Sequence, residues 1–217
     1  MTDASLTLGP ADLAPRARIR EATLRLYAER GLQATSIRMV ANEAGMSPGA
    51  VMHHFRSKDV LAEAVQHAVI AKIRQVVSEV GLEAPPHVAA RERRQAFDQL
   101  VTDNPSIAGY LRRVILDGGP AGVALFTEGF ELVRSEMQAL VEAQVARPLP
   151  DPDVGLVLYR AVHLAHIVFG PLIEQMLGLS LSDPAVLERF RDAAVDLLTH
   201  PVFGETPRLT RPGASSG

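Results

Sequence analysis

The chain has 217 residues, 47% hydrophobic and 22% charged, a balance typical of a globular protein, and it contains no cysteine, which excludes a disulfide framework and a thiolate zinc site. The formal net charge is −3, yet residues 15–76 hold ten Lys/Arg against five Asp/Glu, while the remainder holds twelve against twenty. A basic N-terminal block on an acidic body favours contact of that block with phosphate.

The first predicted elements are two helices that end at glycines. The apolar spacing predicts a helix over 16–30 that stops at Gly31. A short second helix is capped by Thr35 or Ser36 and stops at Gly45. Their inner faces are expected to pack together.

A third helix follows at once. Ser47 is expected to cap it, with Pro48 at its first position, where a missing N–H costs nothing. A fourth, longer helix opens at Lys58. Residues 35–58 therefore have the pattern of a helix-turn-helix, a unit that places its second helix in the major groove of DNA.

The rest of the chain is also predicted to be helical. Further helices are expected at about 88–102, 105–117, 121–146, 153–178 and 184–199, separated by proline- and glycine-rich breaks. No segment alternates as a strand would, so the predicted fold class is all-α. The expected domains are a three-helix DNA-binding head at 15–60, a helical effector-binding and dimerisation body at 61–200, and a flexible tail at 201–217.

The candidate DNA contacts lie on the second and third helices and at the start of the fourth. They are Thr35, Ser36, Arg38, Ser47, Pro48, Gly49, Ala50, Met52, His53, His54 and Lys58. Small residues at 49 and 50 allow close approach to the groove, Arg38 has the reach for guanine or phosphate, and Lys58 is placed to clamp a phosphate at a helix N-terminus. The alternative for the charged residues is ordinary surface charge.

A competing motif occupies the same turn. Gly45 to Gly49 fits G-x-S-x-G, the nucleophile elbow of α/β-hydrolases. That motif needs a preceding buried strand, whereas Val40 to Ala44 has a helical pattern. We therefore expect no catalytic residue and no enzyme.

The run from Gly31 to Val65 resembles the N-terminal domain of the tetracycline-repressor (TetR) family of bacterial transcription regulators. The matching residues are Gly31, Thr35-Ser36, Val40-Ala41, Ala44-Gly45-Met46-Ser47, Gly49, His54-Phe55, Ser57-Lys58-Asp59 and Leu61. The family usually has a threonine or serine at position 50 and a tyrosine at 52, but this chain has Ala50 and Met52. Because both hydroxyls are lost, Arg38, His53 and Lys58 are expected to carry more of the DNA contact.

The segment 153–178 is apolar almost all round, which exceeds what one core-facing stripe requires. Its polar residues, which include Arg160 and Glu174, argue against a membrane span. Burial on two sides, within the subunit and against a partner, suggests a homodimer, and the resemblance implies a four-helix interface. The candidate interface residues are Val157, Ala161, Leu164, Val168, Leu187, Phe190 and Ala194.

The body is also expected to enclose a small molecule. Candidate lining residues are Tyr110, Phe126, Phe130, Met137, His163, His166 and Phe169, although plain core packing is the alternative for each aromatic. The few charges in this set favour an apolar or neutral ligand. His163 and His166 lack a paired carboxylate on their helix, so we expect neither a metal nor a cofactor.

These patterns favour one function over two alternatives. The expectation is a dimeric, cytoplasmic, ligand-responsive regulator that binds a pseudo-palindromic operator, most simply a repressor that its effector releases from DNA. The alternatives are a DNA-binding regulator without an effector and a helical enzyme or carrier. The sequence contains no charged-then-apolar signal peptide, and nothing in it identifies the effector.

Overall fold

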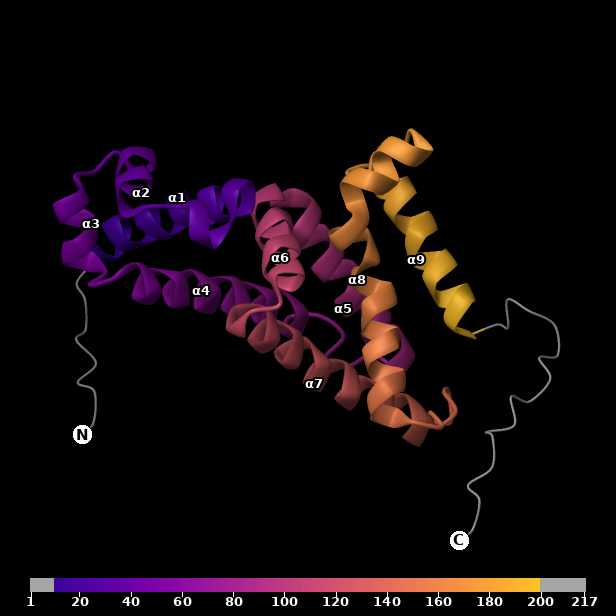
Figure 1. Ribbon diagram of the computed structural model, residues 1–217. Coiled ribbons are helices and arrows are strands. Elements are labelled where there is room, and N and C mark those ends of the chain that lie inside the picture. Colours follow the sequence, from indigo (N-terminus) through magenta and orange to yellow (C-terminus); the bar gives the residue numbers. More distant parts are fainter. Residues whose placement is uncertain (1–9, 200–217) are drawn as a thin grey trace, which may run out of the picture.

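The computed structural model describes the backbone of residues 10–199 and the side chains of residues 14–197. Within those residues the chain forms nine helices and no strand, so the all-α prediction is confirmed (Figure 1). The helices are α1 Pro10–Ala34, α2 Ile37–Ala44, α3 Pro48–His54, α4 Lys58–Ser78, α5 Pro86–Asp103, α6 Pro105–Asp117, α7 Pro120–Glu142, α8 Pro152–Leu177 and α9 Pro184–Thr199. The predicted tail, 201–217, lies outside the described residues.

Helices α1 to α3 and the first turn of α4 form a small unit, the head, at one end of the molecule (Figure 1). Its core consists of side chains with no more than 1% exposure, among them Ile19, Val40, Val51, Phe55 and Leu61. Val51 and Phe55 thus anchor α3 to the other helices of the head. Because these residues lie on four helices, the core fixes α2 and α3 rigidly against α1.

Serine caps and glycine stops set the ends of the head helices. The hydroxyl oxygens of Ser36, Ser47 and Ser57 accept hydrogen bonds from backbone N–H groups three residues on, at 3.1–3.2 Å. Such caps each stabilise a helix by about 1 kcal/mol. Gly45 ends α2 in the left-handed region (φ 65°), and Gly31 breaks α1 at φ 81°, where a short helical stretch to Ala34 follows. The left-handed conformation favours glycine at both places.

Helix α4 leads from the head into the body, so the predicted boundary at residue 60 falls within its first turn. Its buried face is Leu61, Val65, Val69 and Val77. Ala68 is exposed, because the buried row follows every fourth residue through Val69.

Helix α6 lies between the head and α8 (Figure 1), and two adjacent arginines connect it to both. Arg113 Nη2 donates to the carbonyl of Glu29 at 3.0 Å, just before the break at Gly31. Arg112 Nε donates to the carbonyl of Ile167 at 2.8 Å. That carbonyl lacks its helical partner because Pro171, four residues on, has no N–H. Both arginines thus satisfy carbonyls that helix breaks have left free.

Helix α8 is more exposed than a core helix. It is the one described helix that is long and apolar enough, by length and composition, to cross a membrane, with a mean hydropathy of 1.6, and 22% of that window is buried. Such a test is also passed by helices of proteins that enter no membrane. Nine of the sixteen large apolar side chains exposed in the described part of the chain lie on α8 or α9. The expected burial of α8 is thus incomplete within one subunit.

Candidate functional site: a nucleic-acid interface and an interior cavity

The outer surface of the head presents α3 and the start of α2. Ser47, Pro48, Gly49 and His53 are exposed, and Met52 is 40% exposed. The N-terminal turn of α3 therefore offers backbone and small side chains, with nothing bulky to prevent close approach. This surface has the shape that a helix needs to enter a groove of DNA.

Two cationic side chains flank this turn. Arg38, in the first turn of α2, is exposed and enters none of the described ion pairs or hydrogen bonds. Lys58 is half-buried at the N-terminus of α4, where its Nζ donates to the carbonyl of Gln33 at 3.2 Å. Arg38 is thus free to reach a base or a phosphate, while Lys58 is held beside free helix N–H groups, a favourable place for an anion.

Two arginines that the sequence analysis did not single out fix the geometry of this surface. Arg18 Nη2 donates to the carbonyl of Ala44 at the end of α2, and Arg16 Nη1 donates to the carbonyl of His54 at the end of α3, each at 2.7 Å. Arg16 also stacks over the ring of Phe55, 4.5 Å from its centroid. Cations at helix C-termini interact favourably with the free carbonyls there. Arg18 and Ala44 are 26 residues apart in the chain, and Arg16 and His54 are 38 residues apart, so only the fold brings each pair together.

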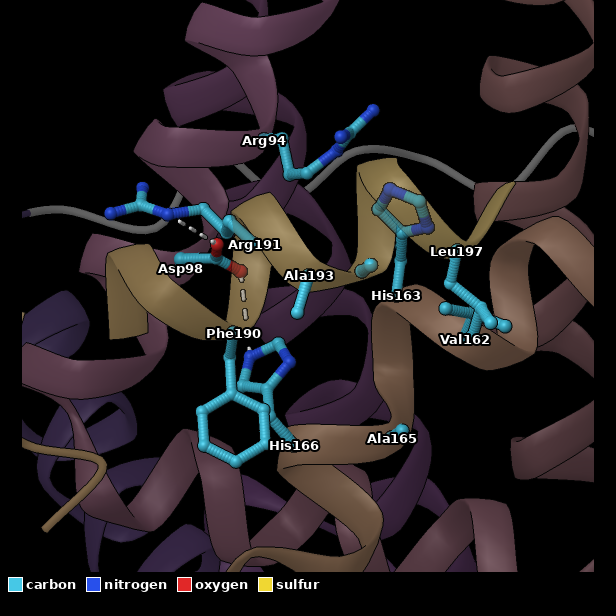
Figure 2. A pocket seen from close by; sticks show the side chains of 11 residues that line it. Arg94, Asp98, Val162, His163, Ala165, His166, Phe190, Arg191, Ala193 and Leu197 are labelled. Carbon is cyan, nitrogen blue, oxygen red and sulfur yellow. Dashed lines mark ion pairs between the residues drawn. The ribbon is translucent and has the colours of Figure 1, made fainter. Parts of the chain in front are cut away.

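The body contains two adjoining cavities. The outer cavity, of about 220 Å³, lies between α8 and α9 and is lined by Val162, Ala165, Phe190, Ala194 and others (Figure 2). The inner cavity, of about 100 Å³, lies among α4, α5, α7 and α8, with apolar walls that include Ile73, Phe97 and Leu132. Arg94, Asp98 and His163 line both, so the two cavities meet at these three side chains.

Asp98 is the most buried charged residue of the cavities, with its side chain 3% exposed. Its Oδ1 lies 3.4 Å from His166 Nε2 and its Oδ2 lies 3.8 Å from Arg191 Nε, as the dashed lines of Figure 2 show. Burial raises the pKa of Asp98 to about 6, although the nearby guanidinium groups of Arg191 and Arg94 oppose this rise. Near neutral pH the carboxylate is therefore still ionised.

The two histidines of α8 are neutral near pH 7. Burial lowers the pKa of His163 to about 4, assisted by repulsion from Arg94, and lowers that of His166 to about 4, assisted by Arg191. His163 Nδ1 lies 2.8 Å from the carbonyl of Tyr159, whose ring stacks on the imidazole. No group of three metal-ligating side chains occurs among the described residues.

Arg160 is half-buried beside the inner cavity. Burial lowers its pKa to about 10, so it remains charged at neutral pH. Its guanidinium stacks over Phe126, 5.5 Å from the ring centroid, and its buried Nε has no hydrogen-bond partner among the described residues. A Cβ at Gly129 would overlap the guanidinium, so this glycine makes room for it.

Comparison with known proteins agrees with this arrangement. The model of bacterial regulatory proteins of the tetR family matches residues 19–65, which include α2, the turn and α3. The head of the chain therefore matches the DNA-binding domain of the TetR family. Residues 19–65, which the family model matches, form most of the head, whose helix ends and core are described above.

Two curated relatives and one solved structure illustrate the extent of the similarity. The chain is 32% identical over 101 residues to the HTH-type transcriptional regulator BetI of Escherichia coli O17:K52:H18, a match that covers 44% of this chain and about half of BetI (51%). It is 25% identical over 203 residues to the HTH-type transcriptional regulatory protein RaaS of Mycobacterium tuberculosis, covering 83% of this chain and 93% of RaaS. The crystal structure of AibR with isovaleryl coenzyme A and operator DNA has a TM-score of 0.66 at 19% identity, covering 84% and 97% of the two chains.

Most of the predicted DNA-contacting residues lie together on one surface of the head. Ser36, Arg38, Ser47, Pro48, Gly49, Met52 and His53 are exposed, and Ala50, His54 and Lys58 are half-buried. Thr35 is different. It is 2% exposed and its hydroxyl donates to the carbonyl of Gly31 at 2.9 Å. Its side chain serves the core of the head, so a side-chain contact of Thr35 with DNA is not available in this structure.

The predicted ligand-binding residues are less well grouped. Of the seven, only His163 and His166 line a cavity described above. Tyr110 is 4% exposed within the apolar core, Phe126 lies under Arg160, and Phe169 is 53% exposed. The cavities are also more charged than expected. Arg93, Arg94 and Asp98 come from α5, and sequence periodicity places such residues on a solvent face.

The predicted dimer residues of α8 and α9 divide between two faces. Val157 and Ala161 are exposed, and Val168, Phe190 and Ala194 are half-buried. Leu164 and Leu187 are each 5% exposed, so their side chains already pack within the subunit. The larger exposed side chains, Phe169, Leu172 and Met176, lie further along α8.

Proposed function

We propose that this protein is a sequence-specific DNA-binding transcriptional regulator, with α3 as the helix that enters the major groove. The observation that carries the proposal is the exposed turn at Ser47–Gly49, held on a rigid core and flanked by the free cation Arg38. Arg38 is assigned to a base edge or phosphate, and Lys58 to a phosphate. The domains follow the same division, with the head at 15–60 and the body at 61–200.

A single head contacts few base pairs, so the active species is a homodimer on a pseudo-palindromic operator. The exposed apolar row of α8, from Val154 to Met176, supports pairing of α8 and α9 with those of a second subunit. A large exposed apolar patch marks an interaction surface in a protein of this kind. Pairing through a patch shared by both subunits gives the two-fold symmetry that such an operator requires.

The two adjoining cavities favour a regulator with a small-molecule effector over one without. AibR, with a similar fold, was crystallised with isovaleryl coenzyme A and operator DNA. In the present protein an effector in the body acts on the separation of the two heads, and its release of DNA makes the protein a repressor. No feature of the cavities requires an enzymatic role.

A gel-shift titration against the DNA next to the protein's own gene tests the DNA-binding proposal. Arg38→Ala is expected to weaken binding to that DNA by about 10- to 100-fold, because a specific arginine contact contributes about 1–3 kcal/mol. Arg147→Ala, an exposed arginine between α7 and α8, is the matched control and leaves binding unchanged. Equal affinity of the parent for this DNA and for unrelated DNA, or an Arg38→Ala affinity equal to that of the parent, contradicts the proposal.

A further inference from the structure

The charges that surround the two cavities do not balance. Four arginines line them, Arg93, Arg94, Arg160 and Arg191, against the two carboxylates of Asp98 and Glu136. With both carboxylates ionised and the histidines neutral, the site carries an excess of two positive charges. Protonation of either carboxylate or either histidine would only increase that excess.

The two carboxylates already have partners. Glu136 Oε1 lies 3.3 Å from Arg93 Nη1, and Asp98 Oδ2 lies 3.8 Å from Arg191 Nε. The excess therefore resides on Arg94 and Arg160. In the part of the chain that the structure describes, neither forms an ion pair.

The direct contacts of these two arginines are with neutral groups, although Arg94 also lies near enough to Asp98 and Glu136 to oppose the rise in the pKa of both carboxyl groups. Arg94 donates to the hydroxyl of Tyr159, and Arg160 stacks over Phe126 with its Nε unpartnered. Both arginines line the inner cavity together with His163, whose pKa they lower. Burying a charge without an opposite charge is costly, and such groups in proteins are normally paired.

The fold accommodates Arg160 at this place. Gly129 of α7 leaves the space that the guanidinium fills, which any Cβ would overlap. Apolar side chains such as Ile73, Phe97 and Leu132 complete the walls of the inner cavity. The site thus combines two cations that form no ion pair among the described residues with walls that are largely apolar.

We propose that the inner cavity binds a small apolar carboxylate, with the carboxylate group held by Arg94 and Arg160 and the hydrocarbon part against the apolar walls. Guanidinium groups suit this anion because their N–H donors match the two carboxylate oxygens. The volume of about 100 Å³ limits the enclosed part to a short chain or a single ring, and a longer molecule extends past His163 into the outer cavity. This assignment deepens the proposed function by naming the chemical class of the effector, and it rests on that function only for the consequence at DNA.

Isothermal titration of the full chain without DNA tests the assignment, with butyrate and benzoate as probes, each beside its neutral amide. At least one carboxylate is expected to bind about tenfold or more tightly than its amide, because a charge-assisted hydrogen bond is lost in the amide. Binding of an amide as tightly as its carboxylate overturns the proposal. So does the absence of binding by both carboxylates at millimolar concentration, or binding of inorganic phosphate alone.

Two variants locate the bound group. Arg160→Gln removes the charge, and Gly129→Ala displaces the guanidinium while the charge stays, so each is expected to weaken carboxylate binding about tenfold or more. Arg134→Gln is the matched control. Arg134 also stacks over a phenylalanine of α7, Phe130 at 4.8 Å, but it is exposed and lines neither cavity. Equal losses in all three variants contradict the assignment, and the comparison of acid with amide in the parent protein needs no variant to fold.

The outcomes separate this inference from the proposed function. Carboxylate binding without any release of DNA in the gel shift leaves the inference standing and removes the effector role from the proposed function. Specific DNA binding by a protein that binds no carboxylate leaves DNA regulation standing and rejects the inference.

Discussion

At the scale of single residues, the interface with DNA depends on which side chains the fold leaves free. Thr35 and Ser36 are neighbours with similar chemistry, yet Thr35 is buried with its hydroxyl donated to Gly31, while Ser36 is exposed and caps α2. Arg16 and Arg18 carry positive charge near the same surface but donate to helix C-termini. Arg38 is left as the free arginine at the start of α2.

Lys58 is expected to act on DNA without regard to sequence. Replacing it with alanine should weaken binding to operator and unrelated DNA about equally and reduce the slope of log K against log[salt] by about 1, because one phosphate contact is lost. Titrations at several salt concentrations measure this slope. If the Lys58→Ala variant has the same slope as the parent, Lys58 does not contact a phosphate. Its hydrogen bond to the carbonyl of Gln33 would then be its role in the head.

At the scale of elements, α8 combines three surfaces in one helix. Leu156, Leu164 and Ile167 pack into the subunit, His163 and Arg160 line the cavities, and Phe169, Leu172 and Met176 remain exposed. Pro171 lies within this exposed stretch, and Arg112 satisfies the carbonyl that it leaves free. The polar residues that line the cavities are thus directed toward the protein, while several apolar residues of α8 are directed toward solvent.

The buried histidines of α8 should make the protein sensitive to acid. The pKa values of His163 and His166 are about 4 in the folded protein, compared with 6.5 for an ordinary histidine. Between these two pH values the unfolded chain binds two more protons at these residues than the folded protein does. The free energy of unfolding therefore falls as the pH drops from about 6.5 to 4. Asp98 opposes this, because with a pKa of about 6 the folded form binds one more proton in the same range. The charged groups near these rings are Asp98 and Arg191 at His166, and Arg94 and Arg160 at His163.

Glu136, whose pKa burial also raises, acts in the same direction as Asp98, so the net difference is at most about one proton. The predicted loss is therefore at most about 1.4 kcal/mol of unfolding free energy per pH unit in this range. Urea denaturation at a series of pH values measures it. The double variant His163→Gln, His166→Gln should reverse the slope, because the contributions of Asp98 and Glu136 remain. A double variant with the pH dependence of the parent shows that other groups govern acid stability.

At the scale of the whole molecule, the head and the proposed dimer surface lie at opposite ends, with α6 between them (Figure 1). Arg113 holds α1 and Arg112 holds α8 from adjacent positions of α6. Gly109 permits the close approach of α6 to α1, since a Cβ there would lie 2.8 Å from that of Ala28. A shift of α8 on ligand binding or pairing therefore has a direct mechanical connection to the head.

The exposed end of α8 should control the oligomeric state. Leu172, which is 65% exposed, is expected to be covered by the second subunit, so Leu172→Glu should convert a dimer at micromolar concentration into a monomer and weaken operator binding. Sedimentation velocity measures the change. Leu82→Glu, at a leucine 77% exposed between α4 and α5, is the control and should remain dimeric. A parent protein that sediments only as a monomer contradicts the pairing of α8 and α9.

The sequence by itself determined the helices and the head. Serine caps at 36 and 47, glycine stops at 31 and 45, and prolines at helix starts act within a few residues, so local chemistry is enough to place them. The contact of Val51 and Phe55 with the core followed from helical periodicity for the same reason. The resemblance carried by residues 31–65 then implied the family, which the comparison confirmed.

The tertiary structure alone decided the interior of the body. Arg94 and Asp98 on α5, Glu136 on α7, Arg160 on α8 and Arg191 on α9 are far apart in sequence, and each alone looks like a residue of a solvent face. Periodicity predicts which face of a helix is apolar, but it does not predict which charged residue a neighbouring helix will cover. The aromatic residues chosen as a ligand site mostly became core or surface, because packing between α5, α7, α8 and α9 placed the cavities elsewhere.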